Sequence, residues 1–136
     1  MKQYVLIGCL GFLLAGCGMT VNQAALDSSV SQVVTRNYQS RSFDTTDKLE
    51  VMNNIVATMQ DLGFVIEKAD KDIGTISGFS FTTQTNMTVS VRPKGNSILV
   101  RANASKGTRA ITDPQAYQNF FNALSQSLFL TANEVL

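Results

Sequence analysis

The feature that most constrains the fold is an apolar stretch at the start of the chain. A single positive charge, Lys2, precedes an apolar run from Val5 to Ala15, and mostly polar residues follow Cys17. A helix of about eleven residues is about 16 Å long, whereas the hydrocarbon core of a membrane is about 30 Å thick. The run is therefore too short to cross a membrane, and its order of charge, apolar stretch and small residues is typical of a secretory signal.

Four residues end this stretch: Leu14, Ala15, Gly16 and Cys17. They resemble the lipobox of bacterial lipoproteins, in which a leucine and two small residues direct processing in front of a cysteine. The resemblance implies that residues 1–16 are the signal peptide. It also implies that the mature chain begins at Cys17, with a diacylglyceryl group on its sulfur and an acyl chain such as palmitate on its amine. An ordinary signal peptide and a buried first strand are the alternatives.

The lipid that this resemblance implies is a permanent anchor. Each buried methylene contributes about 0.8 kcal/mol, and one myristoyl-length chain binds only marginally, so three chains hold a protein on a membrane. In the lipoproteins that the segment resembles, an aspartate after the cysteine favours retention in the inner membrane. Gly18 occupies that position. The resemblance therefore implies the outer membrane, with the domain facing the periplasm.

The chain without its signal carries almost no net side-chain charge. Lys2 is the only charged residue among the first 16 of 136 residues, which leaves ten basic and ten acidic side chains in the remaining 120. This balance argues against electrostatic binding of nucleic acid. A length of 120 residues suffices for one small domain and a tether, and is too short for two domains.

The chain lacks the residues of the commonest catalytic sites. It contains no histidine, and of its two cysteines Cys9 leaves with the signal while Cys17 is blocked by its lipid. Without a histidine base or a free thiol, neither usual nucleophile triad can be assembled, and no disulfide can form. We therefore expect no catalytic residue, no metal site and no cofactor apart from the covalent lipid on Cys17.

The acidic residues fit structural roles. Asp44 and Asp47 precede an apolar helical pattern, where an aspartate caps the helix. Glu67, Asp70 and Asp72 surround a turn and are expected to be solvated. A calcium site at this turn would need further acidic ligands along the loop, and the sequence has none there.

The remaining chain divides into a tether and a domain. Residues 17–37 are mostly small and polar, with Leu26, Val30 and Val33 at helical spacing. We expect a lipidated tether that is flexible or partly helical, because a short helix without a partner surface is marginal in water. The domain is expected to cover residues 38–136.

The domain's pattern predicts two helices and several strands. The first helix begins after Asp47, with Glu50 in capping-box register, and ends at Gly63 as its C′ residue. Asp113 and Pro114 begin the last helix. The expected strands are 38–43, 64–68, 75–82, 87–92 and 98–103. These elements predict a two-layer α+β sandwich, an antiparallel sheet of about four strands covered on one face by two helices.

Apolar spacing defines the expected buried faces. The first helix would bury Leu49, Met52, Ile55, Val56, Met59 and Leu62. The last helix would bury Tyr117, Phe120, Phe121, Leu124, Leu128 and Ala132, with Phe129 and Leu130 broadening the stripe. Gly78 interrupts a strand and indicates either a bulge or a close backbone approach.

Three segments of the domain resemble a group of small proteobacterial lipoproteins. They are residues 38–47, residues 59–64, and the stretch from Asp113 to Phe121. In that group the domain begins with a similar segment, which runs from a tyrosine through an arginine to phenylalanine-aspartate-threonine. The first helix ends in a similar leucine-glycine-phenylalanine sequence, and the last helix begins with a similar aspartate-proline pair. The likeness covers most of residues 38–134, and the short polar turn at 82–86 departs from it. The layout is also similar to the C subunit of the barrel-assembly machine, which implies a protein–protein role.

The basic residues of the last hairpin and the loop after it form one candidate interaction group. They are Arg92, Lys94, Arg101, Lys106 and Arg109. Arg92 and Arg101 are expected to face each other across the two strands. The group is either a solvated face or a docking patch for an acidic partner or a polyanion.

The sheet face opposite the helices is the other candidate. Alternation places mostly polar, uncharged side chains there: Ser77, Thr82, Thr88, Ser90, Arg101 and Asn103. Phe79, Phe81 and Leu99 either join the core or form an exposed patch suited to an interface. Exposed strand edges would also allow a partner to add a strand.

These observations predict a non-catalytic, membrane-anchored periplasmic lipoprotein that is an interaction or accessory subunit of a cell-envelope complex for secretion, efflux or outer-membrane assembly. The alternative is a binding module for a small ligand or an envelope polymer, with a pocket lined by Phe79, Phe120 and Phe121. A carboxylate-based hydrolase is the least supported, because no nucleophile, base and orienting group can be named. The sequence leaves self-association open.

Overall fold

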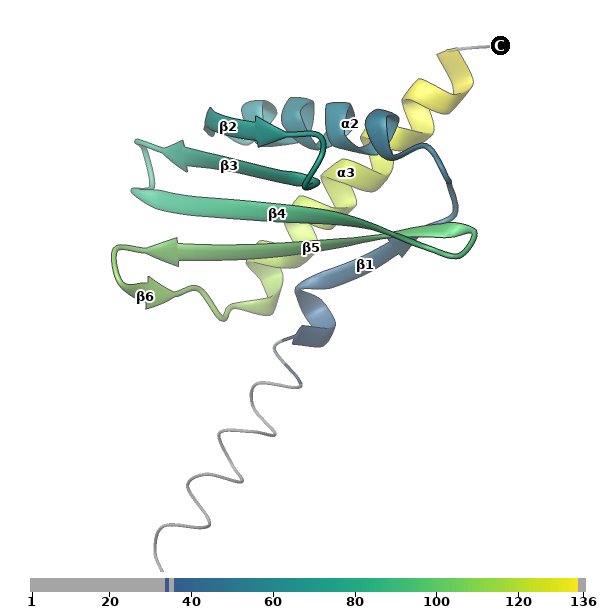
Figure 1. Cartoon of the computed structure of the whole chain (residues 1–136). Helices are drawn as coiled ribbons and strands as arrows, with labels where there is room; N and C mark the ends of the chain where they lie inside the picture. Colours follow the sequence, from purple (N-terminus) through teal and green to yellow (C-terminus); the bar gives the residue numbers. More distant parts are fainter. Residues whose placement is uncertain (1–33, 35, 135–136) are drawn as a thin grey trace, which may run out of the picture. The chain divides into compact units, whose positions relative to one another are not determined.

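The domain consists of an antiparallel sheet with two helices on one of its faces (Figure 1). The computed structural model describes residue 34 and residues 36–134, so the predicted signal, Cys17 and most of the predicted tether lie outside the described residues. The helices are α2 (Lys48–Asp61) and α3 (Pro114–Glu134). The strands are β1 (Ser40–Phe43), β2 (Val65–Asp70), β3 (Thr75–Ser80), β4 (Thr85–Lys94), β5 (Ser97–Lys106) and β6 (Arg109–Ala110). The predicted two-layer α+β sandwich is confirmed.

The sheet has six strands in the order β1-β5-β4-β3-β2, with β6 also paired to β5. Strands β2 to β5 form an antiparallel meander. Strand β1 lies at the edge beside β5, and the connection through α2 takes the chain from there to β2 at the opposite edge. The prediction of about four strands was too low. Part of the difference is β6, which is only two residues long and so carries no alternation that a sequence pattern could reveal.

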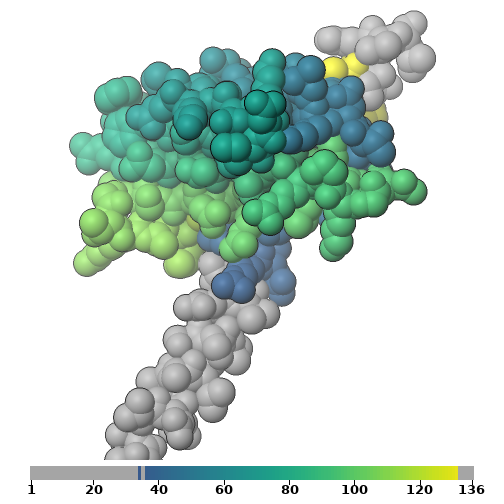
Figure 2. Space-filling model, in the orientation of Figure 1, coloured from purple at the N-terminus to yellow at the C-terminus, as the bar shows by residue number. Residues whose placement is uncertain are grey.

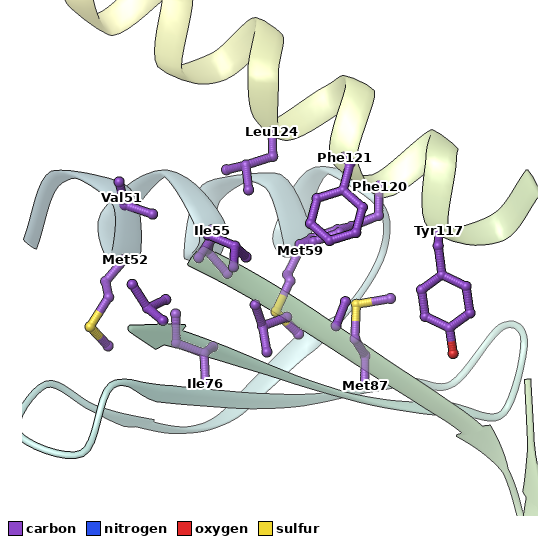
Figure 3. Packing of buried hydrophobic residues seen from close by; sticks show 14 of the residues in the cluster. Val51, Met52, Ile55, Met59, Ile76, Met87, Tyr117, Phe120, Phe121 and Leu124 are labelled. Atoms are coloured by element: carbon purple, nitrogen blue, oxygen red, sulfur yellow. The ribbon is translucent and has the colours of Figure 1, made fainter. Parts of the chain in front are cut away.

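The interior lies between the sheet and the two helices (Figure 3). The alternation predicted for β4 and β5 is confirmed, because every second residue is buried from Thr85 to Val91 and from Ile98 to Ala104. The sheet buries Ile76, Met87, Val89, Val91, Ile98, Val100, Ala102 and Ala104, and the helices bury Val51, Met52, Ile55, Met59, Tyr117, Phe120, Phe121 and Leu124. One continuous apolar layer therefore joins both helices to one sheet face.

Helix α2 begins and ends where the sequence predicts. The Asp47 carboxylate accepts a hydrogen bond from the Glu50 backbone N–H at 3.0 Å, and Gly63 follows the helix with φ +89°. The predicted buried face is wrong at two positions, since Leu49 is 48% and Leu62 42% exposed. Leu49 lies on the far side of the helix from Val51, and Leu62 lies beyond the last helical residue.

Helix α3 buries the first half of its predicted stripe. Tyr117, Phe120, Phe121 and Leu124 are buried, and Leu128 packs at the edge of the core. Its later residues Phe129 and Leu130 are 67% and 53% exposed, so they do not broaden the buried face. The side chain of Ala132 lies outside the described residues.

The Tyr117 hydroxyl joins α3 to the end of β5. It donates a hydrogen bond to the Ile111 carbonyl at 2.6 Å and accepts one from the Ala104 N–H at 3.0 Å. The Tyr38 hydroxyl donates to the next carbonyl, that of Thr112, at 2.6 Å. The connection from β6 to α3 is thereby held against both the sheet and the start of the domain.

Gly78 occupies a close approach beside a β-bulge, as its position in the strand pattern predicts. A Cβ atom there would lie 2.9 Å from the Val65 carbonyl oxygen and 3.0 Å from the Met59 side chain. The register between β2 and β3 shifts between Ile66 and Lys68, and Ile66 pairs with Gly78. The missing side chain allows α2 and the bulged strand to approach the sheet closely.

The position of Phe121 in the apolar layer generates a stability prediction. Phe121→Ala should lower the free energy of unfolding by about 3–5 kcal/mol, because it leaves a cavity against the sheet. Phe81→Ala, at a ring that is 73% exposed, is the matched control and should change it by less than about 1 kcal/mol. Equal losses in urea unfolding of the two variants would contradict this placement of the core.

Candidate interaction surface

The sheet face opposite α2 and α3, here called the outer face, has no helix packed on it among the described residues (Figure 2). Its side chains come from the alternate positions of the strands. Ser77, Thr88 and Asn103 are neighbours across β3, β4 and β5, and Ser90 pairs with Arg101 in the next row. The prediction of a polar outer face is confirmed for these residues. Thr82 is exposed but lies in the β3–β4 turn.

Aromatic residues gather at one end of the outer face. The rings of Phe79 and Phe81 meet edge to face with centroids 4.9 Å apart, and Phe81 is 73% exposed. Val65, which pairs with Phe79, is 55% exposed. The two rings line a hollow of about 560 Å³ together with Gln84, Asn86, Lys106 and Gly107. Of the two interpretations of Phe79 and Phe81, the exposed patch is confirmed and the core placement is wrong.

The pocket expected from Phe79, Phe120 and Phe121 does not exist. Phe120 and Phe121 are each 1% exposed and belong to the layer between helices and sheet. Phe79 alternates with the buried Gly78 and Ser80 and therefore lies on the other face of the sheet. Because the sheet itself separates these rings, they cannot line one cavity.

The five basic residues do not form one group. Lys94 pairs with Ser97 at one end of β5, and Lys106 pairs with Arg109 at the other end. Lys106 is nine residue steps along the strand from Ser97, a distance of about 30 Å. The sequence placed these residues together because they are close along the chain, whereas a long hairpin sends them to opposite ends of the sheet.

Arg92 and Arg101 are brought together, but not directly opposite each other. Arg92 pairs with Leu99 and Arg101 pairs with Ser90, so the two arginines are diagonal neighbours on the outer face. They line a hollow of about 230 Å³ with Ser90, Leu99 and Asn103. The expectation that the two arginines lie directly opposite each other is wrong by two residues. The β4–β5 turn consists of residues 95 and 96, and this register places Leu99, not Arg101, opposite Arg92.

Arg101 has an unusual environment for a charged side chain. It is half-buried, and its Nε atom is buried without a hydrogen-bond acceptor. Within the described part of the chain, neither Arg101 nor Arg92 makes an ion pair or a side-chain hydrogen bond. An unmatched buried donor costs about 1–3 kcal/mol, so Arg101 does not contribute to stability through its charge.

Arg41 provides a contrast on the other face of the sheet. It lies on β1, and its guanidinium donates to Asn122 Oδ1 at 3.2 Å and to Ser125 Oγ at 3.3 Å. The same group lies 5.2 Å from the centroid of the Phe121 ring, within cation–π range. The structure thus gives Arg41 two hydrogen-bond acceptors and an aromatic ring, and leaves the Nε–H of Arg101 without an acceptor.

The edges of the sheet carry features that discourage strand addition. One edge is β2, where a bulge interrupts the register and the exposed Glu67 and Lys68 carry charges. The other edge consists of two short strands paired to β5: β1, which is four residues long and points Arg41 inward, and β6, which is two residues long. Short edge strands, bulges and inward charges are common protections against edge pairing. The outer face is therefore a better candidate surface than the edges.

Of the acidic residues predicted to cap a helix or flank a turn, Asp47 and Asp70 make the expected hydrogen bonds, whereas Asp44 makes no capping hydrogen bond in the described part of the chain. Asp47 caps α2, and Asp70 Oδ1 accepts hydrogen bonds from the backbone N–H groups of Asp72 and Ile73. Among the described residues, no three side chains of His, Cys, Asp or Glu lie close enough to hold a metal ion. In the same part of the chain, no helix has the length and apolar character needed to span a membrane.

Comparison with known proteins adds no constraint on this surface. Neither the protein-family models nor the curated proteins searched give a match to the chain. The candidate surface therefore depends on its own geometry. The sequence held a signal for its aromatic end, because Ser77, Phe79 and Phe81 have the same parity along the strand and a polar Ser77 implies that all three point outward.

Replacing Arg101 and replacing Arg41 should have different effects on the free energy of unfolding. Arg101→Met removes an unmatched buried donor and keeps an apolar stem, so the free energy of unfolding should stay unchanged or rise by about 1 kcal/mol. Arg41→Met, the matched control, should lower it by about 1–3 kcal/mol through its lost contacts. A loss above 1 kcal/mol for Arg101→Met in denaturant unfolding would show that Arg101 has a structural role.

Proposed function

We propose that the chain is a lipid-anchored lipoprotein of the outer membrane whose domain faces the periplasm and docks onto a protein of a cell-envelope complex. The anchor is supported by the lipobox resemblance of Leu14, Ala15, Gly16 and Cys17, and the choice of membrane by Gly18. The proposal gives the domain no catalytic task. Its contribution is a binding surface kept close to the membrane.

The observation that carries the docking role is the outer face with its exposed aromatic pair. Phe81 is 73% exposed beside Phe79, although two helices are present that could have covered aromatic rings. Aromatic and arginine side chains are enriched at the centres of protein interfaces, while lysine and glutamate are depleted there. The outer face combines both enriched types, with the aromatic pair at one end and Arg92 and Arg101 at the other.

The proposed partner is a protein with an apolar region that contacts the aromatic end of the outer face and an acidic region that contacts the arginine end. The aromatic hollow between Phe79 and Lys106 fits an apolar side chain. Arg92, Lys94 and Arg101 add positive charge at the other end of the outer face, and within the described residues none of them is paired with an acid. Charge complementarity of this kind gives specificity and speeds association.

The lipid anchor is tested by Cys17→Ser. Without the thiol no diacylglyceryl group can be attached, so the variant should accumulate as an unprocessed, lipid-free precursor. Labelling with radioactive palmitate and intact-mass measurement of the membrane fraction check this outcome. A variant that is still cut after residue 16 and still bound to membranes would assign the segment to an ordinary signal peptide.

The docking role is tested by photocrosslinking in living cells. A benzoylphenylalanine at position 81 replaces one exposed aromatic side chain by another and should form an adduct with an envelope protein. The same probe at Ala57, an exposed residue of α2, is the control and should give little or no adduct.

Two results decide between the alternatives. An adduct whose partner peptide is identified by mass spectrometry, and which is specific to position 81, supports docking through the outer face. Equal adducts at positions 81 and 57, or none at either, would contradict it. A crosslink from position 81 to a second copy of this chain would identify the outer face as a self-association surface instead.

A further inference from the structure

We propose that the hollow between Arg92 and Arg101 is a binding site for a carboxylate, presented by an aspartate, a glutamate or the chain end of the docked protein. This inference rests on the proposed docking function and specifies the chemistry of one subsite. The site measures about 230 Å³ and is lined by the two arginines with Ser90, Leu99 and Asn103. It lies at the opposite end of the outer face from the aromatic pair.

The positive charges of Arg92 and Arg101 are not paired with an acidic side chain among the described residues. The row of outer-face residues through Arg101 is Ser40, Arg101, Ser90, Thr75 and Asp70. Asp70 is three strands away from Arg101, a separation of about 14 Å, and its Oδ1 already accepts two backbone hydrogen bonds. No acid among the described residues therefore neutralises the arginine pair.

The Nε–H of Arg101 lacks an acceptor. An arginine offers two parallel N–H groups that match the two oxygens of a carboxylate. Because the Nε atom is buried in the unbound structure, binding requires the guanidinium to turn into the hollow, where a carboxylate would accept from the Nε–H that is otherwise unmatched. Binding thus recovers a hydrogen bond that the free protein lacks, while Arg92 adds a second positive charge.

The donors available at the hollow suit a carboxylate better than a phosphate. Phosphate sites commonly use several free backbone N–H groups in a turn or at a helix start. Ser90, Arg92, Leu99 and Arg101 lie inside the paired region of β4 and β5, whose backbone groups form the ladder. Only side chains remain as donors. Leu99 adds an apolar wall, which suits the methylene groups of an acidic side chain.

The test is a titration of the full chain in detergent, isotopically labelled and followed by nuclear magnetic resonance of the arginine Nε–H signals. Propionate imitates the end of a glutamate side chain, and propionamide is its neutral counterpart of the same shape. Propionate should shift the Arg101 Nε–H signal in a saturable way, whereas propionamide should not. Arg92→Gln and Arg101→Gln should each weaken propionate binding by about tenfold.

Arg109→Gln is the matched control, because it removes an exposed arginine at the far end of β5 and should leave propionate binding unchanged. No saturable shift with propionate, or equal weakening by all three variants, would overturn the proposal. Tighter binding of inorganic phosphate than of propionate would overturn the choice of ligand.

If Arg101→Gln does not fold, Arg92→Gln, at an exposed position, still tests whether the arginine pair binds propionate. Photocrosslinking at position 81 is independent of this result, so the two proposals can fail separately.

Discussion

Both helices of the domain cover the same face of the sheet, and this arrangement decides which side chains the domain offers to solvent. Both α2 and α3 bury their apolar residues in the same layer, with Phe120 and Phe121 at its centre. Burial of apolar area is the main source of stability, so the inner face has little freedom to change its side chains. The alternate residues of the same strands do not share this constraint, and the outer face can be shaped by binding.

The two half-buried strand arginines show how differently the two faces are used. Arg41 points inward, where Asn122, Ser125 and the Phe121 ring satisfy it, and it protects the β1 edge. Arg101 points outward with a buried donor and no acceptor. Functional sites often retain groups that lower stability in the absence of a ligand. Together with the exposed ring of Phe81, this imbalance is the reason we propose binding on the outer face rather than at the edges of the sheet.

The sequence predicts the helices and most strands of this fold well. It predicts poorly which residues become neighbours across the strands. Asp47, Gly63 and Gly78 mark a cap, a helix end and a close approach, because each depends on its own local chemistry. The grouping of the basic residues depends on strand length and register, which follow from where the β4–β5 turn lies. The two-residue turn at 95–96 pairs Arg92 with Leu99 and Arg101 with Ser90, which makes the two arginines diagonal neighbours. The edge strand β6 and the inward direction of Arg41 depend on contacts distant in sequence, so no local pattern contains them.

The central claim is that the outer face is covered by a partner in the cell and bare in the purified protein. Maleimide labelling of variants with one added cysteine tests it most directly, with Thr88→Cys on the outer face and Ala57→Cys on α2. The parent chain provides the background from Cys9 and Cys17. The account predicts that Thr88→Cys reacts readily in the purified protein but slowly in intact cells, while Ala57→Cys reacts equally in both. Equal reactivity of Thr88→Cys in cells and in purified protein would contradict the account.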